Sequence, residues 1–344
     1  MKVAIIYDAG SEDWTARDVA AVRDNVNEVR DVLRLRGHEV ETVAVRLGDF
    51  RWLSRCRRSD LVVNLCEGVN GHARYEDYVV AALELTDTAF TGPRSWAISS
   101  CHRKHVANTL LQSAGVPVPK FFLAEGNRMP ADAPLPAIVK PAAEDASVGI
   151  DRGAVCTTRK ALRERVSSLL ELFDDVMVQA YVPGREFNVG FVGELMLPIS
   201  EIDFGRMPEG HWPIVTYAAK WDESHAEFAG TEPVCPAHVP ADLARKLGKV
   251  ARQAWKQMSG GEGYGRVDMR LDEQGQPWVI EVNPCPDLSS DAGLARMGRA
   301  HGWDYGELVM QIVDEALTRT RRTRAAGELT AGKGAAEAAW RPQA

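Results

Sequence analysis

Strand and helix patterns alternate through roughly the first third of the chain, and this alternation limits the possible folds more than any other feature. A β-branched run at 3–7 leads into 16–36, where apolar residues recur at helical spacing until Gly37. Strand–helix–strand order implies a parallel sheet covered by helices, with ligands at the carboxyl ends of the strands. The other elements expected here are strands at 39–45 and 60–65 and a helix at 75–85.

A helix at 102–114 ends at the breaker Gly115-Val-Pro-Val-Pro119, and strands dominate after it. The expected strands are 121–124, 137–140, a short one at Val155, 176–179, 186–192 and 196–202, and the expected helices are 160–173 and 241–258. A hairpin at 266–271 and 278–282 and helices at 291–299 and 304–318 follow.

These patterns predict the fold class α/β, with α+β character in the second part. We expect an N-terminal parallel α/β domain at 1–98, a central subdomain at 99–190 and a C-terminal subdomain at 191–319. Residues 320–344 are rich in Ala, Gly, Arg and Glu without apolar periodicity, and are expected to form a disordered tail.

Composition excludes several classes of protein. The formal net charge of −7 does not favour nucleic acid or acidic membranes as partners. No apolar run approaches the ~20 residues needed to span a bilayer, and the chain enters a strand directly at residue 2, without the layout of a signal peptide. We therefore expect a cytoplasmic protein. The six cysteines are scattered, which argues against a disulfide framework or a zinc site.

The hairpin near the end of the chain carries an unusual set of polar side chains. Glu281 and Asn283 lie two residues apart and face one side of the sheet, and Arg266 and Asp268 have the same relation on the neighbouring strand. Oxygen donors with an arginine suit Mg²⁺ bridging nucleotide phosphates. The alternative is a solvated face with surface ion pairs, which the apolar run 278–280 disfavours.

Two further segments have features of a nucleotide site. An apolar strand ends in Lys140, and the small-residue loop after it, with Ser147 and Gly149, lets backbone N–H groups approach phosphate oxygens. The extended segment 179–182 can read an adenine edge, and the carboxylate of Glu186 can hold ribose hydroxyls. The glycine-rich run 260–265 follows a helix and precedes a strand, so a helix end explains it better than a phosphate loop.

In this order and spacing, the motifs resemble the ATP-grasp superfamily and, within it, the D-alanine–D-alanine ligase branch. The segments that carry the resemblance are Thr91-Gly92, Ala114–Pro119, Ile138–Pro141, Ser147–Gly149, Gly184–Phe187, Ala219-Lys220, Gly265–Asp268 and Ile280–Asn283. The resemblance covers about residues 1 to 320 and implies three domains, with ATP held between the central and C-terminal ones.

Specific roles follow from this resemblance. The implied nucleotide contacts are Lys104 and Lys140 on the phosphates, Glu144, Ser147 and Gly149 in the covering loop, Gln179, Ala180, Tyr181 and Val182 on adenine, Glu186 on ribose, and Lys220 and Met269. The implied ligands of two Mg²⁺ ions, or of Mn²⁺, are Asp268, Glu281 and Asn283. The implied catalytic residues are Arg266, Lys220 on a mobile loop, and Glu12, and the substrate contacts are Glu67, Asp287, Ser290 and Asp291.

The substrate half departs from the family pattern. The usual His-Gly-x-x-Gly-Glu-Asp-Gly loop is replaced by a longer stretch, 66–77, led by Glu67. A serine and a tyrosine that close the phosphate loop are replaced by Ala146 and Trp221, so we expect that link to be absent. Pro-Asp-Leu-Ser-Ser-Asp at 286–291 replaces a segment that normally receives the acceptor's carboxylate.

The new aspartates, Asp287 and Asp291, would repel a carboxylate at that position, so the acceptor either lacks one or carries a positive group. Alternatively both point away, Asp291 as the N-cap of the next helix.

We therefore predict an ATP-dependent carboxylate–amine ligase that works through an acyl phosphate, with amino-acid-like substrates other than two D-alanines. The alternatives are a genuine cell-wall D-alanine–D-alanine ligase and a non-catalytic nucleotide-binding protein. By family analogy, the chain forms a homodimer.

Overall fold

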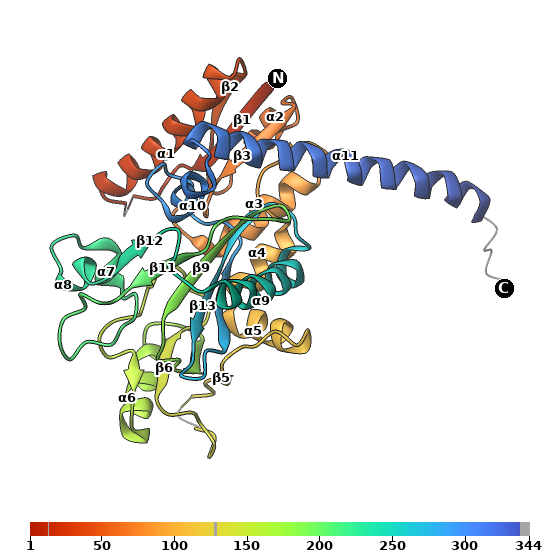
Figure 1. Cartoon of the computed structure of the whole chain (residues 1–344). Coiled ribbons are helices and arrows are strands. Elements are labelled where there is room, and N and C mark those ends of the chain that lie inside the picture. Colours follow the sequence, from red (N-terminus) through yellow and green to blue (C-terminus); the bar gives the residue numbers. More distant parts are fainter. Residues whose placement is uncertain (13, 127–128, 338–344) are drawn as a thin grey trace.

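The computed structural model describes residues 1–12, 14–126 and 129–337, with side chains up to residue 325. Its strands form three sheets, arranged along the long direction of the body in Figure 1. The fold class predicted from the sequence is confirmed: one sheet is parallel and the other two are antiparallel. The division into domains at 98, 190 and 319 stays a prediction.

The N-terminal sheet is parallel, with strand order β2-β1-β3-β4. Its strands are β1 (Lys2–Asp8), β2 (Glu39–Val45), β3 (Leu61–Leu65) and β4 (Ala89–Phe90). Helices α1 (Ala16–Leu35) and α11 (Tyr305–Glu337) bury their apolar stripes on one face, and α2 (Arg51–Cys56), α3 (Glu76–Glu84) and α4 (Ser95–His102) cover the other. Thr15 and Asp18 form a capping box that fixes the start of α1.

The largest sheet has the order β12-β11-β9-β13-β14, with β10 paired to β9. Its strands are β9 (Glu186–Val192), β10 (Leu195–Met196), β11 (Ser200–Asp203), β12 (Glu232–Val234), β13 (Tyr264–Leu271) and β14 (Pro277–Asn283). Helices α5 (Lys104–Ser113) and α9 (Ala241–Ser259) pack on one face around the buried Trp255. Gly260, at φ 71°, ends α9, so the glycine-rich run is a helix end, as predicted.

The third sheet has the order β5-β8-β6-β7 and is covered by α6 (Arg159–Leu170). Its strands are β5 (Phe121–Leu123), β6 (Ala137–Pro141), β7 (Val155–Cys156) and β8 (Val176–Ala180). The remaining elements are the 3₁₀ helix Ala73–Tyr75 and the helices α7 (Tyr217–Trp221), α8 (Ala226–Ala229) and α10 (Gly293–His301). The sequence pattern did not predict α2, α4, α7 or α8, three of which are too short for apolar periodicity to show.

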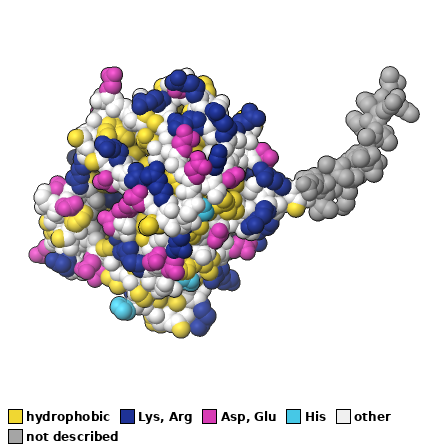
Figure 2. Space-filling model, turned by 90° about the horizontal axis from the view of Figure 1, so that it is seen from above, with side chains coloured by type: hydrophobic (Ala, Val, Ile, Leu, Met, Phe, Trp, Pro, Cys, Tyr) yellow, Lys and Arg dark blue, Asp and Glu magenta, His cyan; other side chains and the backbone are white. Residues whose placement is uncertain are grey.

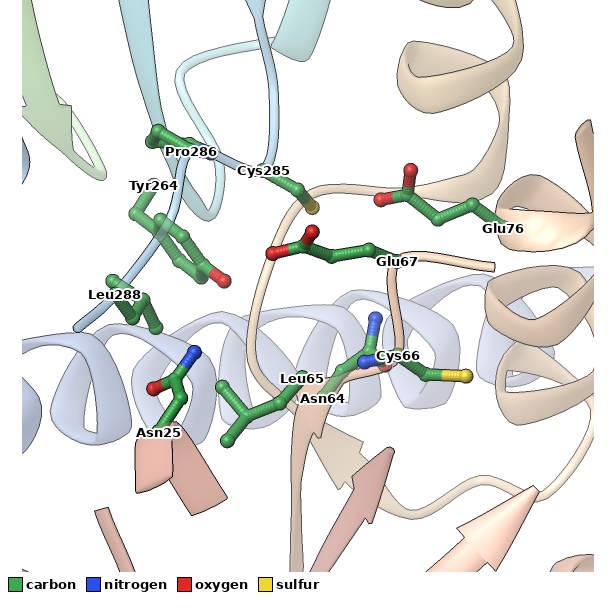
Figure 3. Close-up of a pocket in the computed structure, with 10 residues that line it drawn as sticks. All are labelled: Asn25, Asn64, Leu65, Cys66, Glu67, Glu76, Tyr264, Cys285, Pro286 and Leu288. Carbon is green, nitrogen blue, oxygen red and sulfur yellow. Dashed lines mark hydrogen bonds between the residues drawn. The ribbon is translucent and has the colours of Figure 1, made fainter. Parts of the chain in front are cut away.

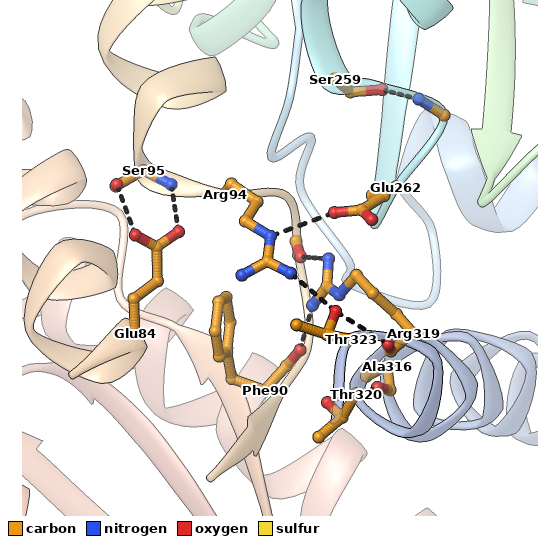
Figure 4. Close-up of polar contacts among 12 residues, drawn as sticks. Glu84, Phe90, Arg94, Ser95, Ser259, Glu262, Ala316, Arg319, Thr320 and Thr323 are labelled. Atoms are coloured by element: carbon orange, nitrogen blue, oxygen red, sulfur yellow. Dashed lines mark hydrogen bonds and ion pairs between the residues drawn. The ribbon is translucent and has the colours of Figure 1, made fainter. Parts of the chain in front are cut away.

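Helix α11 corrects the expectation of a disordered tail from residue 320. The helix continues to Glu337 and leaves the body at its C-terminal end (Figure 1). Arg319 is 2 % exposed and donates from Nη1 to the carbonyl of Gly92 (2.6 Å), while Thr323 accepts from Arg94 Nη2 (3.2 Å; Figure 4). Apolar periodicity ends near residue 320, which is why the sequence predicted disorder. In the structure, these polar contacts hold the helix against the body instead. Residues 338–344 lie outside the described residues.

The described surface agrees with a modest net charge. Figure 2 shows Lys and Arg side chains intermixed with Asp and Glu over the face that it presents. None of the helices described combines the length and the hydrophobicity needed to cross a membrane.

Gly265, on β13, lets Trp255 pack directly beneath the polar end of the sheet. A Cβ at this position would lie 2.2 Å from Trp255 Cζ3 and 2.9 Å from the carbonyl oxygen of Asn283. We expect Gly265→Ala to lower the free energy of unfolding by roughly 1–3 kcal/mol, as overpacking does, in urea unfolding. The control is Gly248→Ala in α9, where the new methyl meets only the flexible Met196 side chain; equal effects in both variants would contradict this packing argument.

Candidate active site

The polar side chains of the β13–β14 hairpin share one face, as predicted. Arg266 pairs in register with Asn283, and Asp268 pairs with Glu281, directly across the two strands. Arg266 donates from Nε to Asp268 Oδ1 (2.6 Å) and from Nη2 to Oδ2 (2.8 Å), a bidentate pair. The solvated-hairpin alternative fails because Asp268 is 5 % exposed.

Two carboxylates that face each other need compensating charge, and the structure supplies it. Lys104 Nζ lies 2.8 Å from Glu281 Oε1, and Asn188 Nδ2 donates to Asp268 Oδ1 at 2.7 Å. Burial alone would raise the pKa of Glu281, but Lys104 and Lys140 hold it at about 2. Glu281 is therefore ionised at neutral pH, as a ligand for a hard cation must be.

Lys104 and Lys140 line a pocket together with the loop that follows β6. Lys104, at the start of α5, also contacts the carbonyl of Glu144 (2.6 Å) and Asp145 Oδ1 (2.9 Å). Burial lowers the pKa of Lys140 to about 8, with Lys104 acting in the same direction. Two neighbouring buried ammonium groups make this pocket attractive for an anion.

The loop between β6 and β7 has a compact, constrained backbone. Ala146 and Ser147 have φ of 54° and 63°, and Gly149 has φ 73°. A Cβ on Gly149 would lie 2.6 Å from Pro141 Cγ, so the loop needs glycine there. The Ser147 hydroxyl donates to the carbonyl of Val215 (2.9 Å), which ties the loop to the segment before α7.

A second tie corrects the expectation that the closing link is absent. Trp221, at the end of α7, donates from Nε1 to the carbonyl of Ala146 (3.1 Å). The link therefore exists, but it runs from an indole to the backbone. The sequence comparison missed it because an alanine supplies the acceptor through its main chain.

We expect Trp221→Phe to raise the KM for ATP about two- to tenfold, the cost of one hydrogen bond. Steady-state kinetics measure this change. Trp96→Phe is the matched control, because Trp96 is 47 % exposed and Trp221 46 %, but Trp96 lies on α4. An unchanged KM in Trp221→Phe would contradict a role for this link.

Lys220, also on α7, is exposed, yet its ammonium group is affected by the charged residues of the β13–β14 hairpin. Burial and the charge of Arg266 lower its pKa, while Glu281, Asp268 and Glu67 raise it. The structure thus brings Lys220 to the group of residues in which the sequence analysis placed it.

The predicted adenine and ribose contacts lie where β8 ends and β9 begins. The backbone N–H groups of Ala180 and Tyr181 donate to the carbonyls of Lys120 (2.7 Å) and Pro136 (3.0 Å). Gln179 Nε2 is buried and has no hydrogen-bond partner among the residues described. The unpaired amide of Gln179 and the main chain at Val182 therefore remain for a ligand.

Arg270 is a residue of this region that the sequence analysis missed. It is 4 % exposed and lies 3.2 Å from Glu186 Oε2, and it donates to the carbonyls of Pro213 (2.7 Å) and Gly184 (2.9 Å). Burial raises the pKa of Glu186 to about 7, against the lowering effect of Arg270. Its position two residues after Asp268, on the same face of β13, was the available signal.

Met269 differs from its predicted role as a nucleotide contact. It is fully buried beside Phe187, Val267 and Leu271, in the core that α9 covers. Strand alternation explains this, because a residue between Asp268 and Arg270 points to the opposite face.

The predicted substrate residue Glu67 lines a pocket at the end of β3 (Figure 3). The lining residues are Asn25, Asn64, Leu65, Cys66, Glu67, Glu76, Tyr264, Cys285, Pro286 and Leu288. Glu67 is exposed at the mouth of this pocket. The protein atoms packed around its carboxyl group, and then the carboxylates of Glu76 and Asp287, raise its pKa to about 8.

The segment after β14 is held by local hydrogen bonds. Asp287 accepts from the backbone N–H (2.8 Å) and the hydroxyl (2.7 Å) of Ser289, and Ser290 donates to Glu28 on α1 (2.9 and 3.0 Å). Asp291 is not the N-cap, because α10 begins at Gly293 and its N-cap is Ala292. The capping alternative for Asp291 is therefore wrong.

Glu12 is the predicted site residue that the structure does not join to the others. It is exposed in the loop before α1, and within the described residues no hydrogen bond or ion pair connects it to the pocket. Its role stays a prediction.

Comparison with known proteins agrees with this arrangement. Residues 110–314 match the family model described as D-ala D-ala ligase C-terminus. A D-alanine–D-alanine ligase of Bordetella avium is 29 % identical over 331 residues, covering 93 % of this chain and 96 % of the relative. That of Bordetella pertussis is 32 % identical over 262 residues, covering 73 % and 78 %.

The fold is also similar to a solved structure of D-alanine–D-alanine ligase from Bacillus anthracis complexed with ATP. The TM-score is 0.72 at 19 % identity, covering 94 % of this chain and 99 % of the other. Because the family model matches more than half of the chain and the Bordetella pertussis relative passes 30 % identity over most of it, the chain belongs to the D-alanine–D-alanine ligase family of ATP-grasp, ADP-forming ligases.

Proposed function

We propose that the protein joins a carboxylate to an amine through an acyl phosphate, with amino-acid-like substrates other than two D-alanines. A carboxylate oxygen attacks the γ-phosphorus of ATP, and ADP leaves. The amine nitrogen then attacks the acyl carbon, the C–O bond to phosphate breaks, and the amine's proton passes to solvent. The products are the amide, ADP and phosphate.

The observation that carries the reaction class is the hairpin with its cations. Arg266 is fixed by its bidentate pair with Asp268, so its guanidinium is oriented before substrate arrives. We assign it to the negative charge of the transferring phosphoryl group and of the tetrahedral intermediate. Lys104 and Lys140 hold the phosphates, and Lys220 reaches the γ-phosphate from α7.

The donor set on the hairpin fits Mg²⁺. Asp268 and Glu281 are carboxylates on paired strands, and the amide of Asn283 lies beside them, across from Arg266. Bound there, the metal would neutralise charge on the phosphates, and Mn²⁺ has the same oxygen preference. The protein residues keep the ligands ionised and fix their positions.

The altered substrate loops carry the second half of the proposal. Glu67 leads the longer stretch that replaces the usual family loop, and by the resemblance Asp287 lies near the place where the family receives the acceptor's carboxylate. Both are acidic, and Glu76 adds a third carboxylate to their surroundings. D-alanine offers a carboxylate to this region, and the like charge of the Asp287 carboxylate disfavours it.

The test is phosphate release from Mg-ATP with a panel of D- and L-amino acids, amines and dipeptides, with products identified by mass. We expect D-alanine alone to be inert and another pair to yield an amide. If D-alanine yields its dipeptide efficiently, the protein acts as the Bordetella relatives are named. If no pair releases phosphate while ATP binds, the non-catalytic alternative holds. Assembly as a homodimer remains a proposal that sedimentation tests.

A further inference from the structure

Glu227, on α8, is a buried carboxylate to which the proposed reaction gives no role. It is 2 % exposed, and among the residues described no lysine or arginine forms an ion pair with it. Burial of an ionised group is costly unless the group is hydrogen-bonded. The compensation comes from two side chains of the segment that precedes α7, so the carboxylate connects this segment to α8.

The two carboxylate oxygens of Glu227 bind the two ends of residues 211–216. Oε1 lies 2.6 Å from His211 Nδ1, and Oε2 accepts a hydrogen bond from the Thr216 hydroxyl. Burial alone would raise the pKa of Glu227, but these two hydrogen bonds lower it below its ordinary value. The carboxylate is therefore ionised at neutral pH, and its bond with the Thr216 hydroxyl is charge-assisted.

The middle of this segment contacts the nucleotide region. The centres of the Trp212 and Tyr181 rings lie 5.1 Å apart, edge to face. Arg270, which also contacts the predicted ribose carboxylate, donates to the carbonyl of Pro213 (2.7 Å). The segment that Glu227 holds is thus fixed against the residues expected to bind adenine and ribose.

Thr216 passes this constraint on to α7. Its hydroxyl has a single proton, which goes to Glu227, so a lone pair remains to accept from the backbone N–H of Ala219 (3.1 Å). The carbonyl of Thr216 accepts from the backbone N–H of Lys220 (3.2 Å). Thr216 is the N-cap of α7 and is 2 % exposed. One residue held by Glu227 therefore fixes the main chain from which the Lys220 side chain extends.

Helix α7 needs such support, because a helix of five residues is not stable by itself. The bonds from Ser147 to Val215 and from Trp221 to Ala146 join its surroundings to the loop after β6. Glu227 supports α7 from a different element, since α7 and α8 lie side by side at the edge of the body (Figure 1).

We propose that Glu227 is a positioning residue of the ligase reaction: through Thr216 it holds α7 so that Lys220 meets the γ-phosphate of ATP. This inference rests on the proposed function for the role of Lys220. Glu227 acts only through its neighbours, so its loss should affect nucleotides that carry a γ-phosphate and spare those that lack one. A merely structural role would weaken the binding of both kinds of nucleotide alike.

Thr216→Val tests the inference, because valine keeps the shape of the side chain and removes the hydroxyl. Calorimetry at saturating Mg²⁺ measures the affinities for ADP and for a non-hydrolysable ATP analogue, and their ratio is the γ-phosphate preference. We expect this preference to fall about tenfold, the scale of one hydrogen bond between charged groups, with the affinity for ADP unchanged. Thr216→Ser keeps the hydroxyl and should retain the preference of the unmodified protein.

Thr158→Val is the matched control. Thr158 is the N-cap of α6 and likewise accepts from the backbone N–H three residues on, that of Ala161 (3.2 Å), but within the described part of the chain no carboxylate holds its hydroxyl. Its γ-phosphate preference should equal that of the unmodified protein. Glu227→Gln is the second variant, in case Thr216→Val does not fold, as judged by thermal unfolding. An amide has one acceptor oxygen, so it cannot accept from both His211 and Thr216. An unchanged preference in both Thr216→Val and Glu227→Gln, or equal losses of affinity for ADP and the analogue, would overturn the inference.

A double-mutant cycle shows whether the effect passes through Lys220. Lys220→Met alone should lower the γ-phosphate preference at least as much as Thr216→Val does. The double variant should show no further loss, because the two residues act as one unit. Losses that multiply would mean that Thr216 acts by another route, and would overturn the inference.

Phosphate release with the panel of substrate pairs separates failure of the inference from failure of the proposed function. If a pair releases phosphate and Lys220→Met lowers the preference, but Thr216→Val leaves it unchanged, the inference fails and the ligase reaction stands. If both variants lower the preference without further loss in the double variant, but no pair releases phosphate, the role of Glu227 is supported and the reaction is contradicted.

Discussion

Arg266→Ala is expected to lower kcat by at least about 10³-fold, the scale of an arginine that stabilises a transferring phosphoryl group, while ATP binding changes little. The reason is geometric: the two nitrogens that Arg266 gives to Asp268, Nε and Nη2, lie on one edge of the guanidinium, so Nη1 takes no part in this pair. Single-turnover phosphate release and calorimetric titration with the non-hydrolysable analogue measure the two effects separately.

The matched control is Arg51→Ala. Arg51 makes the same bidentate pair with an aspartate two residues away, donating to Asp49 from Nε (2.9 Å) and Nη2 (2.6 Å), but on the surface at α2. We expect no change in kcat there. Loss of ATP binding in Arg266→Ala, with kcat preserved at saturating ATP, would contradict the role given to Arg266.

Glu281→Gln is the second large effect we expect, with turnover falling about 10²- to 10³-fold and the Mg²⁺ concentration for half-maximal activity rising. The substitution keeps an oxygen for Lys104 but removes the charge whose ionisation Lys104 and Lys140 maintain. Activity measured against Mg²⁺ concentration at saturating ATP shows the change, and chelation of the metal should abolish turnover in both proteins.

Glu84→Gln controls for the loss of a hydrogen-bonded glutamate. Its carboxylate accepts from the backbone N–H (3.1 Å) and the hydroxyl (2.9 Å) of Ser95, and it makes no contact with the polar hairpin residues among the hydrogen bonds described (Figure 4). The Mg²⁺ dependence should stay as in the unmodified protein. An unaltered Mg²⁺ dependence in Glu281→Gln would rule out Glu281 as a metal ligand.

Apolar periodicity was sufficient to predict the long elements. Helix α1 was expected at 16–36 and spans Ala16–Leu35, and β2 and β9 have the predicted bounds. The short helices α7 and α8 were not predicted, because their positions depend on tertiary contacts. Glu227 on α8 is buried and accepts from His211 Nδ1 (2.6 Å) and from the Thr216 hydroxyl, a network that no local pattern reveals.

Side-chain alternation predicted the hairpin face, because residues two apart in a strand must share a side. The same rule, continued past Asp268, places Arg270 on the site face of β13. It also places Met269 on the opposite face, which excludes Met269 as a nucleotide contact. The tie from Trp221 to Ala146 lies beyond such rules, since its acceptor is a backbone carbonyl and its partner lies 75 residues away. Sites built from main-chain atoms leave little trace in side-chain chemistry.

The central claim, activation of a carboxylate by phosphoryl transfer, is tested most directly with a substrate whose carboxylate oxygens are ¹⁸O. In the proposed reaction, one of these oxygens attacks phosphorus and leaves with phosphate when the amine displaces it. Mass analysis of the phosphate released with the productive pair should show one ¹⁸O in each phosphate. Phosphate free of ¹⁸O would show that water, and not the carboxylate, received the phosphoryl group, and would contradict the account.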